Sequence, residues 1–112
     1  MCILPLRGLL TPHLFGAIIF AMHWVYIIKS KKNGELYIGN TGNLIQRLKE
    51  HNLGRSRATA RYRPWFYVYI EGYFSEDDAV NREHNLKYFG KVYAQLKRRI
   101  KNSLQGAEKV RG

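Results

Sequence analysis

The sequence predicts an α+β domain in which a small three-stranded antiparallel sheet is flanked by helices, in the order β-β-α-β-α-α. Residues 24–30 are rich in β-branched and aromatic side chains, and the dipeptide Asn33-Gly34 after them is a strong hairpin signal. Residues 35–39 are the expected return strand, and the aromatic run at 65–71 predicts the third strand. A chain of 112 residues suits one such domain.

A helix is expected between the second and third strands. Thr41 and Asn43 are alternative N-caps for a helix over residues 44–51, because short polar side chains accept hydrogen bonds from the first free backbone amides. Residues 52–54, which include a glycine, end this helix. Residues 55–64 follow as a basic loop.

Two further helices are predicted after the third strand. Ser75 is the expected cap of the first, since acidic residues fill the turn that follows and favour the positive end of the helix dipole. This helix is expected to run to about Phe89, with Gly90 as its stop. Residues 91–101 are the last predicted helix, and one face of it carries Val92, Leu96 and Ile100.

The charge and the cysteine content limit the kinds of partner and the classes of protein that fit this chain. The chain has 19 Lys and Arg against 8 Asp and Glu, a net charge of +11, and its pI is near 10. This surplus favours a polyanionic partner, either nucleic acid or an anionic membrane surface, over a basic protein whose charges are merely solvated. The single cysteine, Cys2, rules out an intramolecular disulfide framework and a cysteine-based zinc finger, and it fits a cytoplasmic protein.

The first 21 residues differ from the rest. Residues 14–22 are almost wholly apolar, but this run is shorter than the roughly 20 residues of a membrane span. Arg7 is the only early charge and no small-residue cleavage pattern follows, which argues against a signal peptide. We expect no stable membrane insertion. Two interpretations of these residues remain: a hydrophobic leader, or a stretch that precedes the true start at Met22. The predicted organisation is an extension over 1–21, a domain over 22–101 and a basic tail over 102–112.

Two tyrosines are predicted to share one face of the hairpin. An even-numbered loop keeps Tyr26 and Tyr37 on the same side, because side chains alternate along a strand. Gly39 lies on the same surface and leaves room for a group to approach the backbone. The alternative is that both are ordinary sheet tyrosines.

Arg47 and His51 are four residues apart on the first predicted helix, so their side chains lie one above the other. Leu44 and Leu48 form the neighbouring apolar stripe, which places the pair at its edge rather than fully in water. The alternative is a solvated arginine beside a histidine that favours the helix dipole.

Glu83 is a carboxylate on a largely apolar helix face. Its neighbours one turn away are Ala79, Val80, Leu86 and Lys87. A carboxylate there is costly unless a cation or hydrogen-bond donors meet it. A metal ion, an arginine, tolerance at the edge of the stripe or an ion pair with Lys87 would each explain it.

These residue types together suit phosphodiester hydrolysis. One carboxylate with waters and phosphate oxygens is a normal Mg²⁺ site, and the ion and an arginine stabilise the charge that develops on phosphate. A phenol or an imidazole can take the proton from the attacking water. The sequence contains no Walker loop, no dinucleotide glycine fingerprint and no His-Glu-x-x-His stretch.

Over residues 22–100 the chain resembles the GIY-YIG nuclease superfamily, above all its small stand-alone bacterial members. The resemblance is carried by Trp24-Val25-Tyr26, by Tyr37-Ile38-Gly39 after a ten-residue gap, and by Arg47, His51 and Glu83. It implies a three-stranded antiparallel sheet packed with helices and a one-metal site, for Mg²⁺ or Mn²⁺, that acts on DNA. It also implies site roles for Tyr26 and Tyr37 (one of them a general base), Arg47 (scissile phosphate), His51 (second His or Tyr) and Glu83 (metal).

The sequence departs from the family pattern in three places. The first motif reads Trp-Val-Tyr in place of Gly-Ile-Tyr, which keeps the tyrosine. Asn40 follows the second motif where some members carry a basic residue, so we expect one phosphate contact to be missing. The late asparagine of the family has no direct counterpart, and Gln95 and Asn102 are the candidates.

Two basic clusters are candidate nucleic-acid contacts, because such clusters bind phosphates without reading sequence, although charge runs are also found on faces that are merely solvated. Tyr62 and Trp65, beside the basic loop, are expected to stack on an unpaired base. The two clusters are the loop arginines Arg55, Arg57, Arg61 and Arg63, and the last-helix residues Lys97, Arg98, Arg99 and Lys101.

The sequence therefore predicts a metal-dependent, structure-selective DNA nuclease of repair or recombination, with RNA as an alternative substrate. Glu83 is expected to hold Mg²⁺, Arg47 to contact the phosphate, and Tyr37 or His51 to activate the nucleophile. Recognition of a particular DNA sequence is expected to be weak or to be supplied by a protein partner. The competing hypotheses are a catalytically weak nucleic-acid-binding module of the same fold, and a membrane-surface protein that uses its leader and basic face.

Overall fold

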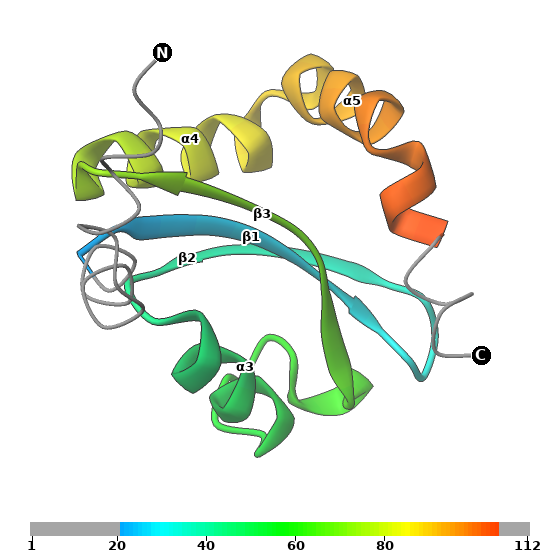
Figure 1. Cartoon of the computed structure of the whole chain (residues 1–112). Coiled ribbons are helices and arrows are strands. Elements are labelled where there is room, and N and C mark those ends of the chain that lie inside the picture. The colour runs from blue at the N-terminus through cyan, green and yellow to red at the C-terminus, as the bar shows by residue number, and fades with distance from the viewer. Residues whose placement is uncertain (1–20, 106–112) are drawn as a thin grey trace, which may run out of the picture.

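Three antiparallel strands form the sheet, with β1 (His23–Ser30) between β2 (Leu36–Thr41) and β3 (Trp65–Tyr73), as Figure 1 shows. The structure is a computed structural model that describes residues 21–105. Residues 1–20 of the expected extension over 1–21, and residues 106–112 of the expected tail, lie outside the described residues. Within the described part, no helix is long and apolar enough to cross a membrane.

The hairpin between β1 and β2 forms where the Asn-Gly dipeptide predicts it. The amide of Ser30 donates to the carbonyl of Glu35 at 2.9 Å, and the amide of Gly34 donates back to the Ser30 carbonyl at 3.0 Å. Gly34 has a φ of 78°, a conformation that side chains with a Cβ rarely adopt. The turn therefore fixes the register that pairs Tyr26 with Gly39.

Helices cover both faces of the sheet (Figure 1). Helix α3 (Leu44–Asn52) lies against one face, while α4 (Glu76–Tyr88) and α5 (Gly90–Arg99) lie against the other. A short 3-10 turn, η1 (Ala60–Tyr62), interrupts the basic loop. The element order β-β-α-β-α-α and the three-stranded antiparallel sheet confirm the predicted fold class.

The two faces of the sheet carry different cores, because neighbouring side chains of a strand point to opposite sides. The core under α3 is built around Tyr26, Ile28 and Trp65, with the leucines of α3 packed on it. The core under α4 and α5 is aliphatic, and its buried members are Val25, Ile27, Ile38, Ala79, Leu86, Leu96 and Ile100.

Helix α3 begins and ends on side-chain and glycine signals. The side chain of Asn43 accepts a hydrogen bond from the amide of Gln46 at 3.0 Å, so Asn43, and not Thr41, is the N-cap. The helix ends where the amide of Gly54 donates to the carbonyl of His51 at 3.2 Å, with Gly54 at a φ of 78°.

The boundaries of the last two helices differ from the prediction. Ser75 is the N-cap of α4, but its side chain makes no capping hydrogen bond. Gly90 does not stop α4: Phe89 is extended, with φ −119° and ψ 95°, and Gly90 opens α5. An extended residue ends a helix by interrupting its dihedral repeat, so no glycine is needed. Helix α5 ends at Arg99 rather than at residue 101.

Residues 101–105 form a further helical stretch beyond α5. Leu104 packs against the aliphatic core, and its carbonyl accepts a hydrogen bond from Lys29 Nζ at 3.2 Å. These contacts tie the end of the described chain to the central strand.

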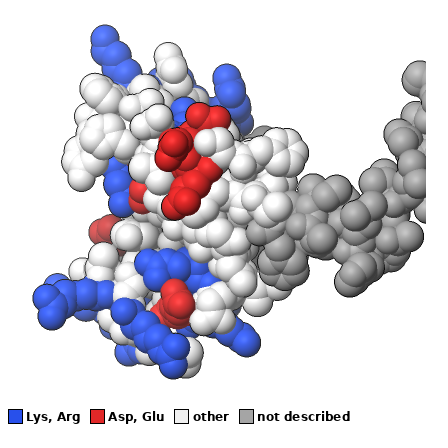
Figure 2. All heavy atoms as spheres, turned by 90° about the vertical axis from the view of Figure 1, so that its left-hand side faces the viewer, with Lys and Arg blue, Asp and Glu red and all other residues white. Residues whose placement is uncertain are grey.

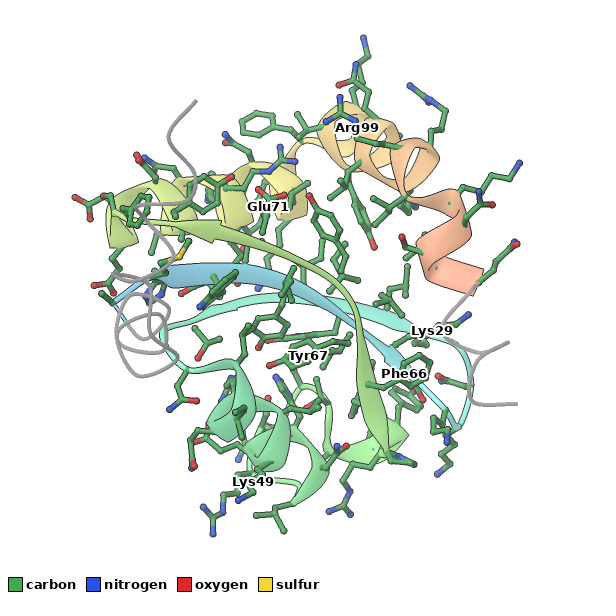
Figure 3. The ribbon with its side chains drawn as sticks, viewed as in Figure 1. Lys29, Lys49, Phe66, Tyr67, Glu71 and Arg99 are labelled. Carbon is green, nitrogen blue, oxygen red and sulfur yellow. The ribbon has the colours of Figure 1, made fainter. Side chains whose placement is uncertain are left out.

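A partly buried carboxylate holds α4 against the sheet. Glu71 of β3 accepts hydrogen bonds from the hydroxyls of Tyr69 (2.7 Å) and Tyr73 and from Arg82 Nε of α4 (2.9 Å), on the sheet face opposite Tyr67, as Figure 3 shows. Burial opposes ionisation of Glu71, but these hydrogen bonds and the charge of Arg82 outweigh it and lower its pKa. The cluster fixes α4, the helix that carries Glu83.

Candidate active site

The phenol of Tyr26 is the meeting point of the predicted site residues. Its hydroxyl lies 2.8 Å from Nε2 of His51, and Nε of Arg47 donates to the same oxygen at 3.3 Å. Tyr26 comes from the central strand and the other two from α3, whose i,i+4 spacing places them one above the other. The structure thus brings three of the predicted residues together.

Gly39 makes room for this phenol. A Cβ at residue 39 would collide with the hydroxyl and the ring of Tyr26. The prediction that Gly39 leaves room for a group to approach the backbone is right about the space, but the group that fills it belongs to the protein. The glycine therefore lets a large aromatic ring lie directly on the neighbouring strand.

His51 is held from both ring nitrogens. Its Nδ1 lies 2.7 Å from Oγ1 of Thr59, and both residues have no exposed surface. Thr59 belongs to the basic loop, which folds back after α3 through η1. Sequence reasoning missed Thr59, because nothing in a threonine eight residues after a histidine predicts their contact.

Burial sets the charge state of these groups. Desolvation raises the pKa of Tyr26 to about 12, although the neighbouring Arg47 acts in the opposite direction. Desolvation, together with the charge of Arg47, lowers the pKa of His51 to about 4. At neutral pH the tyrosine is therefore protonated and the histidine is uncharged.

Arg47 is the part of this cluster that reaches solvent. Its side chain is 31% exposed and its Nη1 donates to Oε1 of Glu50 at 2.9 Å. The prediction that Arg47 lies at the edge of the apolar stripe agrees with this position, whereas His51 is more deeply buried than expected. Arg47 can therefore contact a bound phosphate, and His51 cannot without movement of the surrounding chain.

Tyr37 lies on the same face as Tyr26, as the hairpin predicts, because Tyr37 pairs with Ile28 and Tyr26 pairs with Gly39. Its ring centroid is 5.5 Å from that of His51. Unlike Tyr26, it is partly exposed. The ammonium of Lys87 lies 5.3 Å from its ring centroid, within the range of a cation–π contact.

Glu83 is engaged through both carboxylate oxygens. Oε1 accepts from Nδ2 of Asn40 at 2.5 Å, and Oε2 pairs with Nζ of Lys87 at 2.9 Å. Asn40 is oriented in turn by His23, whose Nε2 lies 2.9 Å from Oδ1. Of the explanations left open for this carboxylate, the structure shows the ion pair with Lys87, joined by an amide donor that sequence reasoning missed.

The donor chemistry at Glu83 fits a hydrated divalent ion. Its side chain is 17% exposed, and Mg²⁺ commonly binds through one or two carboxylates while it keeps several waters. In the described part of the chain, no group of three or more His, Cys, Asp or Glu side chains could hold a metal ion, so Glu83 would be a single protein carboxylate on the ion. The ion would have to replace Lys87 at Oε2.

The site has two parts that meet at β2, an edge strand. Tyr26 and Tyr37 face α3, whereas Asn40 pairs with Val25 on the face toward α4, where it meets Glu83. Lys87 joins the parts, because its ammonium contacts both Glu83 and the ring of Tyr37. A ligand that touches both Arg47 and Glu83 would therefore lie across this edge.

The two basic clusters lie on opposite sides of the sheet. The basic loop follows α3 below the sheet in Figure 1, while α5 lies above it. Figure 2, which views the left-hand side of Figure 1, shows Lys and Arg side chains gathered in the lower part and an acidic group in the upper part, where α4 begins. All four loop arginines are exposed. The basic loop, which also carries Thr59, is the cluster next to the site.

The predicted stacking role of Trp65 is wrong. Trp65 is only 4% exposed, and its indole nitrogen donates to the carbonyl of Thr59 at 2.8 Å. Its ring fills the core under α3, so no base can reach its face. Tyr62 is partly buried and packs against the same core.

An apolar pocket of about 700 Å³ lies apart from these residues, between α3 and β3. Tyr67 points from the sheet toward α3 in Figure 3 and contributes to its wall with Lys49. None of the predicted site residues lines this pocket. Its lining is Leu44, Ile45, Leu48, Lys49, Asn52, Leu53 and Tyr67.

Comparisons with known proteins show which family this chain belongs to. The GIY-YIG catalytic domain matches residues 22–91. A UPF0213 protein of Staphylococcus haemolyticus is 40% identical over 72 residues, which are 63% of this chain and 87% of that protein. A second, from Staphylococcus saprophyticus, is 34% identical over 70 residues, 62% of this chain and 84% of that protein.

A solved structure is also similar: the solution NMR structure of a UPF0213 protein from Bacillus halodurans, with 27% sequence identity and a TM-score of 0.42, covering 68% of this chain and 85% of that one. The domain match carries the assignment, because it spans more than half of the chain and contains β1, β2, α3, β3 and α4. It confirms the resemblance seen in the motifs. The chain belongs to the GIY-YIG catalytic domain family.

Proposed function

We propose that the chain is a divalent-metal-dependent nuclease that hydrolyses phosphodiester bonds in DNA of selected structure, in repair or recombination. The observation that carries this proposal is that Arg47 and His51 both contact the phenol oxygen of Tyr26, with Glu83 at the same sheet edge. Membership of the GIY-YIG family gives a nuclease-type catalytic domain and a nucleic-acid substrate. The metal, the DNA structure and the pathway are our proposal.

The positions of the side chains divide the roles. Arg47 is charged and partly exposed, so it is the group that contacts the scissile phosphate. Tyr26 and His51 are wholly buried and act through Arg47, which makes them positioning residues. This assignment leaves Tyr37, the partly exposed tyrosine, as the general base, whose phenolate oxygen would accept the proton of the attacking water.

Glu83 would hold the divalent ion, with Mg²⁺ or Mn²⁺ as the expected occupant. The bound ion would supply Lewis-acid stabilisation of the charge that develops on phosphate. Asn40 keeps the carboxylate in place through Oε1, and His23 keeps the amide of Asn40 turned toward it. A neutral amide at residue 40, in place of a basic side chain, therefore supports the metal ligand rather than the phosphate.

The basic loop is the proposed contact for the flanking phosphates. Its arginines are exposed and carry no acidic partner among the ion pairs of the described residues. The loop itself contacts His51 through Thr59. Such contacts give salt-dependent affinity without sequence readout. Lys97 and Arg98 of α5 lie across the sheet and are proposed as a secondary surface.

Cleavage of labelled DNA tests the proposal. The full chain is incubated with single-stranded, nicked, branched and duplex substrates in Mg²⁺, Mn²⁺ or EDTA. We expect metal-dependent cleavage that is lost in Glu83→Gln and in Arg47→Ala. Glu76→Gln and Lys49→Ala are matched controls, since each changes an exposed residue of the same helix. Cleavage at the normal rate in both site variants would refute the proposal.

One observation favours a second function. Both oxygens of Glu83 are already bonded, by an amide and an ammonium, so the carboxylate is satisfied without a metal. A catalytically weak nucleic-acid-binding module would show this arrangement. Salt-sensitive DNA binding by the full chain, without cleavage in any metal, would support this alternative.

A further inference from the structure

A line of polar groups runs through the core under α3. Nε of Arg47 lies 3.3 Å from the Tyr26 hydroxyl, which lies 2.8 Å from Nε2 of His51. Nδ1 of His51 lies 2.7 Å from Oγ1 of Thr59, and that hydroxyl donates to the carbonyl of Ser56 at 3.4 Å. Tyr26, His51 and Thr59 have no exposed surface, so water does not complete these bonds.

The direction of this line depends on which nitrogen of His51 carries the proton. A neutral imidazole donates through one nitrogen and accepts through the other. If Nδ1 carries it, His51 donates to Thr59, Thr59 donates to Ser56, Tyr26 donates to Nε2, and Arg47 donates to the tyrosine oxygen. Every donor in the line then has an acceptor.

The other tautomer leaves a donor without a partner. If Nε2 carries the proton, the Tyr26 oxygen accepts from both His51 and Arg47, and its own O–H has no acceptor among the described residues. A buried hydroxyl without an acceptor costs free energy. The line of bonds is therefore complete only with the proton on Nδ1.

We propose that Thr59 is a positioning residue that holds His51 in the Nδ1-protonated tautomer, so that Tyr26 donates to His51 and turns its oxygen toward Arg47. The guanidinium is then fixed at the edge of the sheet by a chain of contacts that starts in the basic loop. The catalytic consequence rests on the proposed nuclease function. The tautomer itself does not.

Long-range ¹H–¹⁵N NMR of the full chain at pH 7 measures the tautomer directly. The signals of His51 are assigned by their loss in His51→Gln. In the wild type and in Thr59→Ser, we expect the Nδ1 shift of a protonated nitrogen and the Nε2 shift of an unprotonated one. In Thr59→Val, which keeps the shape but removes the acceptor, we expect the proton to move to Nε2 in part or in full.

Cleavage rates supply the functional arm. Loss of the bond should lower the cleavage rate of Thr59→Val about tenfold, the effect of one hydrogen bond of ordinary strength, while Thr59→Ser stays near wild type. An Nε2-protonated His51 in the wild type would overturn the proposal, as would an unchanged tautomer in Thr59→Val. If Thr59→Val does not fold, Thr59→Ala, which also removes the hydroxyl, takes its place in the same measurement. If no variant cleaves DNA, the proposed function fails while the NMR result stands.

Discussion

Replacement of Gly39 by alanine tests the close packing on which the site depends. The added Cβ would collide with the hydroxyl of Tyr26 and with the ring carbon that carries it, and it would lie 3.0 Å from Cε2 of the same ring, so the tyrosine has to move. Overpacking of a core costs about 1–3 kcal/mol, and loss of the bond from Tyr26 to His51 adds about 1 kcal/mol. We expect Gly39→Ala to lower the free energy of unfolding by about 2–4 kcal/mol.

Urea denaturation and thermal melting of the full chain measure this cost. For a domain of this size, about 2–4 kcal/mol corresponds to a fall in Tm of about 8–30 °C. Gly90→Ala is the matched control, because nothing lies within 4 Å of a Cβ at residue 90 and alanine favours the helix there. A Gly39→Ala variant as stable as Gly90→Ala would refute the packing of Tyr26 on β2.

Three further predictions concern the charges around the site. Lys87→Met should tighten Mn²⁺ binding about three- to tenfold, because it frees Oε2 of Glu83. Electron paramagnetic resonance measures this affinity, and Lys91→Met is the control that should not change it. Equal affinities in the two variants would show that Lys87 does not compete with the ion. The pKa of His51 is about 4 when folded against 6.5 normally, so its contribution to stability is complete above pH 6.5 and is lost as the pH falls toward 4, by at most about 1.4 kcal/mol per pH unit. Urea denaturation should show that the free energy of unfolding changes less between pH 7 and pH 5 in His51→Gln than in the wild type. An identical change in both proteins would contradict this burial effect. Arg57→Ala in the basic loop should weaken DNA binding equally for all sequences and reduce the slope of log affinity against log salt by about 1; an unchanged slope would place the loop away from DNA.

Local pattern was enough to predict the strands and the shared face of the two tyrosines. The Asn-Gly turn fixes the register of the hairpin, and the alternation of side chains then puts Tyr26 and Tyr37 on one side. The helical repeat likewise stacks Arg47 over His51. These relations lie within one element or one tight turn, so residue type and spacing determine them.

Helix ends and aromatic roles were less predictable. Gly90 has the residue type of a helix stop, but the extended conformation of Phe89 ends α4 one residue earlier. Trp65 stands next to a basic loop in the sequence, yet it fills the core because β3 begins there and turns its side chain toward α3. In both cases the packing of neighbouring elements decided between conformations that the local sequence allows.

By itself, the sequence determined the fold class, the family motifs, and the side chains that carry the proposed chemistry. Only the tertiary structure decided their partners: Thr59 on His51, and Asn40 and Lys87 on Glu83. Asn40 and Glu83 are far apart in the sequence, as are Tyr26 and His51, and their contacts depend on the direction in which each helix crosses the sheet. Spacing along the chain fixes which side chains share a face, whereas burial and long-range packing fix what each of them touches.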